Sequence, residues 1–154
     1  MLEVKTVYLK SIFDPELFQK TVSSTIAMAE KIKAEHDFDT IVFSGVSGSA
    51  MAFILGHALK VPILCVRKAS DGSHFADYSK GSPLEGNIGV YRYLIVDDFI
   101  STGRTANYII DAVSENNPQA ECVAMLMYTE GYNKTHQHPP WQKPIDVISS
   151  KPME

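Results

Sequence analysis

Hydrophobic and polar positions along the chain follow two spacings, one helical and one typical of strands. Asp14-Pro15 is a good helix start, an N-cap followed by proline, and predicts a helix to about residue 35. Its apolar stripe consists of Phe18, Val22, Ile26, Ala29 and Ile32. Further helices are predicted over 48–60 and 104–116, where Asn117-Pro118 interrupts the pattern.

Short apolar runs between these helices predict strands. They cover residues 4–9, 40–44, 62–67, 93–96, 122–128 and 145–148. Because strands alternate with helices, we expect an α/β fold with a mostly parallel sheet and helices on both faces. In such sheets ligands bind at the carboxyl ends of the strands. Residues 69–90, with four glycines and few apolar positions, predict a long exposed loop of a length typical of functional lids.

Composition narrows the class of protein. With 154 residues, 45% of them hydrophobic, the chain suits one compact domain over 1–154. A net charge of −4 and the absence of a Lys/Arg run argue against nucleic acid as a partner. No stretch approaches the about 20 apolar residues of a membrane span, and we expect a cytoplasmic protein without a membrane partner. Cys65 and Cys122 lie in apolar runs, which predicts small buried side chains rather than a disulfide or metal site.

The most informative segment is 93–105, with the sequence YLIVDDFISTGRT. An apolar strand ends on two carboxylates, Asp97 and Asp98, and a hydroxyl-rich loop leads into a helix at Arg104. The unpaired N–H groups and positive dipole end of a helix N-terminus suit a phosphate. Two adjacent carboxylates cannot hold a phosphate, but they can accept hydrogen bonds from sugar hydroxyls or help hold a hydrated Mg²⁺. This combination implies a sugar phosphate as ligand.

The same order of residues resembles the phosphoribosyl pyrophosphate (PRPP) motif of the type I phosphoribosyltransferases. The likeness runs through the whole of 93–105 and is much more specific than a lone Gly-rich loop. One alternative is an ordinary strand-to-helix junction that carries Asp-Asp, and another is a response-regulator receiver domain. In a receiver domain the acidic pair follows the first strand and a phosphorylatable Asp comes later. Here only Asp111 and Asp146 come later, neither in that setting.

The resemblance assigns roles within this segment. It implies that Asp97 and Asp98 hold the ribose hydroxyls and, partly through water, Mg²⁺, and that Asp98 stabilises positive charge on the ribosyl ring in catalysis. The loop expected to bind the 5′-phosphate consists of Ser101, Thr102, Gly103, Arg104 and Thr105. Family members that act on 6-oxopurines have an Asp where this chain has Ser101, which argues against a hypoxanthine- or guanine-type enzyme.

Two further segments are expected to bind pyrophosphate. The first is a Gly-rich turn before a helix, formed by Ser44, Gly45, Val46, Ser47, Gly48 and Ser49. It lacks the Arg or Lys of many family members, and its alternative is a tight turn that binds nothing. The second is Arg67-Lys68 after the third strand, similar to the Arg-Lys step of orotate- and adenine-type enzymes. Its alternative is a solvated pair of charges at a strand end.

The resemblance also implies a lid and a small variable hood around a core of about 15–128. The lid candidates are His74, Tyr78 and Lys80, and the further lysines of orotate-type lids are absent. The hood would comprise about 1–13 and 129–154. The side chains expected to stack on a base are Tyr128, Tyr132 and Trp141. His136 and His138 have no third ligand nearby, so we prefer a polar loop there to a metal site.

The function that this resemblance implies is transfer of ribose 5-phosphate from PRPP to a purine or pyrimidine base, with release of pyrophosphate and dependence on Mg²⁺. One alternative is a regulator of the same fold that binds PRPP or a nucleotide without turnover, which the cation-free turn and the missing lid lysines favour. Another is a phosphoribosyl hydrolase, in which water replaces the base. Family members are commonly dimers, so a homodimer is expected.

Overall fold

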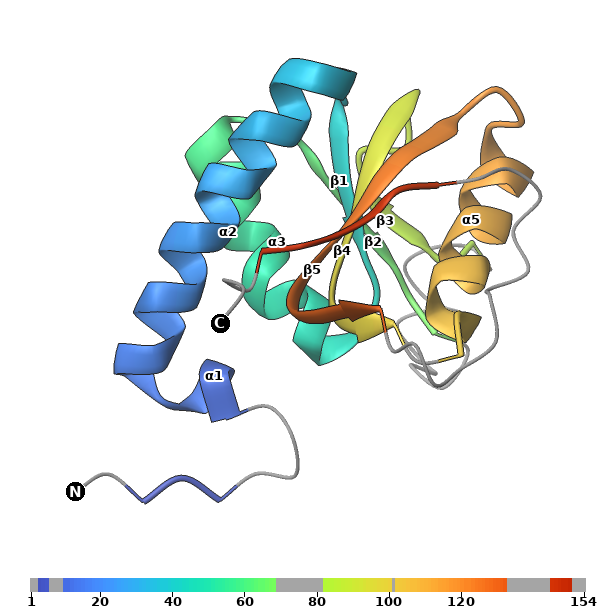
Figure 1. Ribbon diagram of the computed structural model, residues 1–154. Coiled ribbons are helices and arrows are strands. Elements are labelled where there is room, and N and C mark those ends of the chain that lie inside the picture. Colours follow the sequence, from blue (N-terminus) through green and yellow to red (C-terminus); the bar gives the residue numbers. More distant parts are fainter. Residues whose placement is uncertain (1–2, 6–9, 69–81, 101, 133–144, 151–154) are drawn as a thin grey trace.

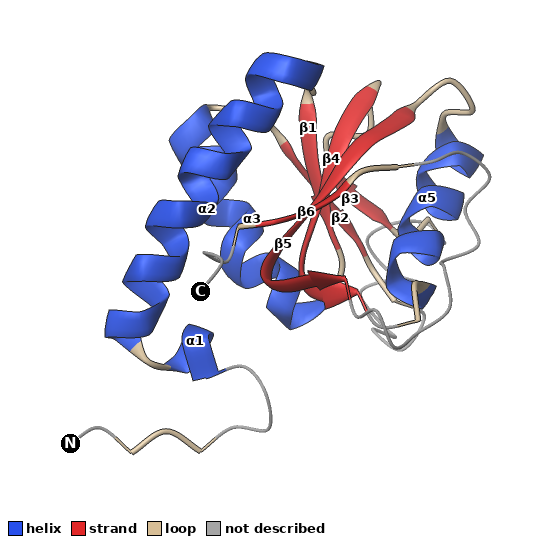
Figure 2. Cartoon of the chain, in the orientation of Figure 1, coloured by secondary structure: helices blue, strands red, loops and turns tan. Residues whose placement is uncertain are grey.

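The described part of the chain forms a six-stranded sheet with helices on both faces (Figure 1, Figure 2). The structure is a computed structural model, and it describes residues 3–5, 10–68, 82–100, 102–132 and 145–150. Its helices are α1 (Lys10–Phe13), α2 (Pro15–His36), α3 (Gly45–Leu59) and α5 (Arg104–Asn116). Its strands are β1 (Thr40–Phe43), β2 (Ile63–Val66), β3 (Leu84–Gly86), β4 (Arg92–Ile100), β5 (Glu121–Tyr132) and β6 (Val147–Ser149).

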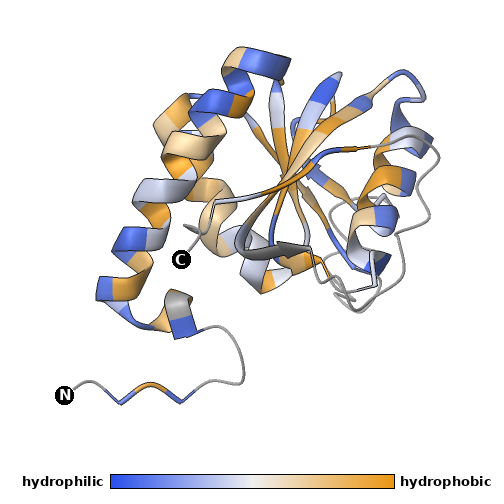
Figure 3. Cartoon of the chain, in the orientation of Figure 1, coloured by the Kyte–Doolittle hydropathy of each residue, from blue (hydrophilic) through white to orange (hydrophobic). Residues whose placement is uncertain are grey.

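The sheet has the order β3-β2-β1-β4-β5-β6, and neighbouring strands are parallel except for β2 and β3. The predicted α/β fold is therefore confirmed. Its central strands are apolar along their length because both faces of the sheet are covered, and Figure 3 shows hydrophobic residues concentrated there. Successive residues of a strand point to opposite faces. Accordingly, Ile41 packs into the core under α2 and α3, and Val42 packs into the core under α5.

Helices α2 and α5 lie close to where the sequence predicts them. Asp14 caps α2, since its Oδ1 accepts hydrogen bonds from the N–H groups of Glu16 and Leu17 at 3.1 and 3.2 Å. α5 begins at Arg104 and its cap Asn117 donates its backbone N–H to the Val113 carbonyl. Local capping signals therefore fix both helices.

Helix α3 begins three residues earlier than the predicted start at residue 48. Ser44 has extended backbone angles and Gly45 has φ 81°, so the chain passes from β1 into α3 without an intervening loop. A side chain at Gly45 would be strained at that φ. The small polar residues at this junction resemble a turn in sequence, although Ser47 and Ser49 lie in the first turns of the helix.

Strand β4 continues through the acidic pair to Ile100, beyond the predicted end at Val96. Its pairing with β5 is irregular there, because Asp97 lies opposite Met127 and Phe99 lies opposite Gly131. Residues 128–130 of β5 thus lie opposite the single residue Asp98, an arrangement of the β-bulge type. Bulges often occur beside active sites, where they redirect side chains.

The predicted loop over 69–90 contains an unpredicted strand, β3, which pairs antiparallel with β2. Leu84 and Val90 are buried, at 6% and 0% exposure. Three residues are too few for a strand periodicity to show in the sequence. Residues 3–5 are not part of a strand and 6–9 lie outside the described residues, so the expected strand over 4–9 is not found in the described part. The predicted last strand is present as β6, at Val147–Ser149.

Cys65 and Cys122 do not form a disulfide with each other, and both are half-buried rather than fully buried. Cys65 packs at the edge of the core under α3, and Cys122 at the edge of the core under α5. Of the helices in the described ranges, none combines the length and apolar character needed to cross a membrane.

Candidate active site

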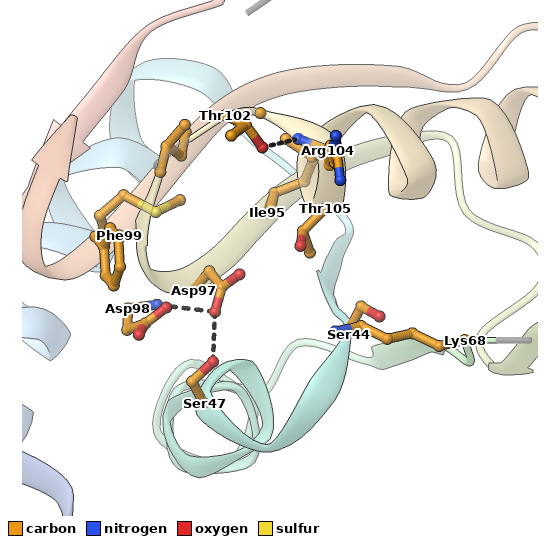
Figure 4. A pocket seen from close by; sticks show the side chains of 14 residues that line it. Ser44, Ser47, Lys68, Ile95, Asp97, Asp98, Phe99, Thr102, Arg104 and Thr105 are labelled. Atoms are coloured by element: carbon orange, nitrogen blue, oxygen red, sulfur yellow. Dashed lines mark hydrogen bonds between the residues drawn. The ribbon is translucent and has the colours of Figure 1, made fainter. Parts of the chain in front are cut away.

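A hollow of about 210 Å³ opens at the carboxyl ends of the central strands (Figure 4). It lies where β4 ends and where α3 and α5 begin. Its lining consists of Ser44, Ser47, Lys68, Ile95, Asp97, Asp98, Phe99, Ile100, Thr102, Gly103, Arg104, Thr105, Ala106 and Met127. Most of the described residues expected to bind a sugar phosphate therefore surround one cavity, although they come from three separate stretches of the chain.

The acidic pair forms one wall of this cavity. Asp97 Oδ1 accepts hydrogen bonds from Ser47 Oγ and from the backbone N–H of Asp98, both at 2.9 Å. Asp98 is only 5% exposed, and its carbonyl accepts a 2.6 Å hydrogen bond from Thr129 Oγ1. The hydroxyl of Ser47 thus ties the first turn of α3 to the end of β4, as Figure 4 shows.

Burial, and next the neighbouring charge of Asp98, raise the pKa of Asp97 to about 7. The hydrogen bonds from the Asp98 N–H and from Ser47 oppose this shift by stabilising the carboxylate. A cation placed between the two carboxylates would relieve their repulsion.

Magnesium fits this donor set. Mg²⁺ is commonly held by one or two carboxylates, with waters and phosphate oxygens completing its octahedron. Asp97 and Asp98 supply two carboxylates on one wall of the cavity. Among the described residues, no group of three or more His, Cys, Asp or Glu side chains could hold a metal ion.

The N-terminus of α5 forms the opposite wall. Gly103, at φ 84°, is the N-cap and offers no side-chain hydrogen bond to the first turn. Thr102 Oγ1 accepts a 3.3 Å hydrogen bond from the Arg104 N–H, which holds the loop against the helix start. The N–H groups of a first helical turn have no partners within the helix. They suit an anion at this wall.

The first turn of α3 forms the third wall. Ser44 is 2% exposed, and its buried Oγ has no hydrogen-bond partner among the described residues. A buried hydroxyl without a partner is costly, which indicates that a ligand or water completes the site. Gly48 is needed for close packing, because a Cβ there would lie 3.0 Å from Phe43 Cβ and 3.1 Å from the Val96 carbonyl oxygen.

Only part of the expected pyrophosphate set lines this cavity. Val46 and Ser49 line a second hollow, and Ser49 Oγ donates to the Val46 carbonyl. Lys68 lines the cavity, and its Nζ lies 3.4 Å from the position that a Cβ on Gly45 would occupy. The turn has no Lys or Arg of its own. Lys68, which follows β2 and Arg67, therefore supplies an ammonium group beside it.

Arg67 differs from Lys68 in the direction of its side chain. Its guanidinium binds Glu85 through Nε at 2.7 Å and Nη2 at 2.6 Å, and it lines the second hollow of about 480 Å³. Of the two cations of this step, only Lys68 is therefore among the described lining residues of the first cavity, and binding of pyrophosphate by Arg67 stays a prediction. Sequence analysis missed the contact of Arg67 with Glu85, because Glu85 belongs to the unpredicted strand β3.

Tyr128 does not have the open face expected of a base-stacking residue. It is 2% exposed within the core under α2 and α3, and its hydroxyl donates a 2.6 Å hydrogen bond to the Ser47 carbonyl. This hydrogen bond holds the first turn of α3 against β5. Of Tyr132, only the backbone at the end of β5 is described. The candidates outside the described residues are Ser101, His74, Tyr78, Lys80 and Trp141.

Sequence analysis also missed several residues that shape the cavity. Phe99 and Met127 line it directly. Tyr108 reaches the strand end behind Lys68, where its hydroxyl donates a 2.7 Å hydrogen bond to the Arg67 carbonyl. Tyr108 lies four residues after Arg104, on the same side of α5, and this spacing is the signal that would have identified it.

Comparison with known proteins agrees with this geometry, although no model of a protein family matches the chain. An orotate phosphoribosyltransferase of Pyrobaculum aerophilum is 29% identical over 123 residues, which covers 79% of this chain and 59% of the relative. A hypoxanthine/guanine phosphoribosyltransferase of Ferroglobus placidus is 33% identical over 110 residues, covering 66% of this chain and 56% of the relative. Both relatives are phosphoribosyltransferases, and the chain is similar to this class of enzyme.

A solved structure supports the fold of this phosphoribosyltransferase-like chain over most of its length. The adenine phosphoribosyltransferase of Saccharomyces cerevisiae matches with a TM-score of 0.64 and 21% identity, covering 92% of this chain and 83% of that one. The receiver-domain alternative is therefore wrong. The chain spans less than two thirds of the length of the two curated relatives described above, 59% and 56%.

Proposed function

We propose that this protein transfers ribose 5-phosphate from PRPP to a purine or pyrimidine base and releases pyrophosphate. The observation that carries the proposal is the convergence on one hollow of an acidic pair, a helix N-terminus whose N-cap is a glycine, and an ammonium group beside a second helix N-terminus. These groups match the three parts of PRPP: its ribose hydroxyls, its 5′-phosphate and its pyrophosphate.

Each wall of the hollow receives one part of the substrate in this proposal. The 5′-phosphate binds the segment 102–105, together with Ser101, which precedes it in sequence. Asp97 and Asp98 accept hydrogen bonds from the ribose hydroxyls. The pyrophosphate binds the turn at Ser44–Ser47, where the unpartnered Ser44 hydroxyl and Lys68 complete the contacts.

The chemistry requires charge stabilisation more than a reactive side chain. The C1′–O bond breaks and its electron pair leaves on pyrophosphate, while a lone pair of the base nitrogen forms the new C1′–N bond and that nitrogen releases its proton. Asp98, 5% exposed at the pocket wall, stabilises the positive charge that develops on the ribosyl ring. Bound Mg²⁺ would supply positive charge to the leaving pyrophosphate. Asp97 and Asp98 would hold it, partly through water.

The position of Lys68 favours the transferase over the regulator. The argument for a regulator from sequence was the lack of a cation in the turn 44–49, and Lys68 places one beside it. The regulator and the hydrolase remain as outcomes of the experiment below. A cytoplasmic location stays a prediction from the sequence.

We also infer that the protein is a homodimer. Val46 and Phe53 on the outer side of α3 are 74% and 58% exposed, although the other side of the helix is buried. Exposed apolar side chains that lie together on one element are typical of interfaces. We expect a dimer in light scattering after gel filtration, and a monomer for Phe53→Glu. A monomeric wild type would contradict this inference without affecting the assignment of the pocket.

The test of the proposed function is calorimetric titration of PRPP with Mg²⁺. We expect micromolar binding by the wild type and at least a 100-fold loss in Asp97→Asn/Asp98→Asn, because the ribose and the metal lose both carboxylates. The matched control is Asp111→Asn/Asp146→Asn, which changes the same charge at two exposed residues outside the hollow. The control should bind like the wild type.

Turnover is then measured as pyrophosphate release in the presence of single nucleobases. Release that requires one base supports the transferase. Release that is independent of any base would identify a hydrolase, and tight binding without release across bases would identify a regulator. Equal PRPP binding by the wild type and the Asp97→Asn/Asp98→Asn variant would show that the site is assigned to the wrong residues.

A further inference from the structure

Among the described residues, contacts from two other parts of the fold hold Arg67, the residue before Lys68. The Arg67 N–H donates a 2.7 Å hydrogen bond to the Pro83 carbonyl, and its guanidinium binds Glu85. On the other side, the Arg67 carbonyl accepts the 2.7 Å hydrogen bond from the Tyr108 hydroxyl. The contacts from Pro83 and Glu85 therefore come from β3 and the residue before it, and the contact from Tyr108 comes from α5.

The contact from Tyr108 acts directly on the orientation of Lys68. The carbonyl of Arg67 belongs to the planar peptide unit that includes the N atom and Cα of Lys68. A hydrogen bond to that carbonyl oxygen consequently limits the rotation of the whole unit. It fixes where the Lys68 side chain departs from the backbone, and hence which part of the hollow its ammonium reaches.

The same contact connects the two ends of the hollow. Tyr108 lies one turn beyond Arg104 on α5, the helix whose N-terminus forms the 5′-phosphate wall. Its partner lies just past β2, which is separated from β4 by β1 in the sheet. The hydroxyl therefore spans from the helix that follows β4 to the strand end that carries Lys68.

We propose that Tyr108 is a positioning residue that sets Lys68 at the pyrophosphate end of the site, at a fixed distance from the 5′-phosphate wall. This inference rests on the proposed function, since it takes Lys68 as a pyrophosphate ligand. Lysine has a flexible four-carbon stem, and its ordering on binding costs conformational entropy. A backbone already held in place lowers that cost, so the effect of Tyr108 is confined to ligands that contact Lys68.

The test compares two ligands that each fill one end of the hollow. Magnesium pyrophosphate and ribose 5-phosphate are titrated separately into the wild type and into Tyr108→Phe, which lacks only the hydroxyl. We expect pyrophosphate affinity to fall by about three- to tenfold, the range for loss of one hydrogen bond, and ribose 5-phosphate affinity to stay within about twofold. Tyr91→Phe, at a tyrosine that is 54% exposed, is the matched control and should bind both ligands like the wild type.

A second variant distinguishes positioning from a general loss of structure. In a Lys68→Met background, Tyr108→Phe should cause no further loss of pyrophosphate affinity, because the group that it positions is gone. An unchanged pyrophosphate affinity in Tyr108→Phe would overturn the inference. So would equal losses for both ligands, or additive losses in the double variant. A wild type that binds neither ligand would contradict the proposed function itself, and the inference with it.

Discussion

The acidic residues at the two ends of the sheet differ in the partners that the protein gives them. At the amino end, the Asp39 carboxylate accepts hydrogen bonds from the N–H groups of Tyr91 and Arg92 and from the Thr40 hydroxyl. The Arg92 guanidinium in turn binds the His36 carbonyl and Glu121. Each charged group here is hydrogen-bonded within the protein.

At the carboxyl end, Asp97 and Asp98 lie side by side and neither forms an ion pair with a described residue. The pKa of Asp97 is raised to about 7, and the buried Ser44 hydroxyl has no partner among the described residues. At the amino end the polar groups thus have partners within the protein, whereas at the carboxyl end a buried hydroxyl is left for a ligand or water. This difference locates the site without reference to any relative.

The largest expected effect is on the pH dependence of stability, measured without metal or ligand. Asp97 has a folded-state pKa of about 7 and an unfolded value of about 3.9, so the unfolded chain loses this proton first as pH rises. The free energy of unfolding should therefore fall between about pH 4 and pH 7, by at most about 4 kcal/mol, and stay level above pH 7. Urea unfolding across this range would measure it.

Asp97→Asn removes that titration. The variant should be more stable than the wild type at pH 8 and similar to it at pH 4, because asparagine does not ionise. A variant that is less stable than the wild type at pH 8 would show that the carboxylate stabilises the fold. The two ends of the sheet would then not differ in the way described.

The second effect concerns the amino end. Asp39→Ala removes an acceptor from two backbone N–H groups and should lower the free energy of unfolding by about 2 kcal/mol, the range for hydrogen bonds to a charged group. PRPP affinity should not change, since Asp39 lies at the opposite end of the sheet. A loss of affinity at unchanged stability would break the division between a structural end and a binding end.

The third effect is smaller and tests the packing of α3 on β4. Gly48→Ala places a Cβ 3.0 Å from Phe43 Cβ and 3.1 Å from the Val96 carbonyl oxygen, so the helix must move away. Overpacking should destabilise by about 1–2 kcal/mol, even though alanine favours a helix. The displacement should also weaken PRPP binding through the Ser47–Asp97 hydrogen bond. Thermal unfolding and calorimetry measure both, and a stabilised variant with full affinity would contradict this.

The smallest effect separates the two cations after β2. Lys68→Met should weaken magnesium pyrophosphate binding by at least tenfold, whereas Arg67→Met should change it by about threefold or less, because its partner Glu85 is exposed and an exposed ion pair contributes little. Equal losses in the two variants would show that Arg67 also contributes to pyrophosphate binding. Each variant loses one positive charge, so each serves as the control for the other.

The sequence predicted what depends on neighbouring residues. The start of α5 and its end before Asn117-Pro118 follow from helix signals, and the acidic pair follows from the apolar run before it. The direction of the Arg67 side chain depends on contacts distant in sequence. Adjacent residues in an extended segment point to opposite sides, and contacts such as those from Glu85 and Tyr108 decide which of them faces the hollow.

Tyr128 and β3 illustrate the same limit. An aromatic residue near the end of a strand can stack on a ligand or fill a core, and the contact with the Ser47 carbonyl, 81 residues away, decides for the core. β3 exists because its three residues pair with β2, and no local pattern records a pairing partner. Strand pairing and side-chain direction depend on contacts within the assembled sheet, so local patterns in a single sequence do not predict them.

The junction between β1 and α3 has a consequence for how this pocket can change in evolution. Helix α3 begins at Gly45, directly after Ser44, so the connection has no spare residues. Inserting or deleting one residue would rotate the rest of α3 by about 100°. Such a rotation would part Ser47 from Asp97 and from the Tyr128 hydroxyl at once. We therefore expect a one-residue insertion after Ser44 to remove both contacts, whereas an exchange of side chains at this junction can keep them.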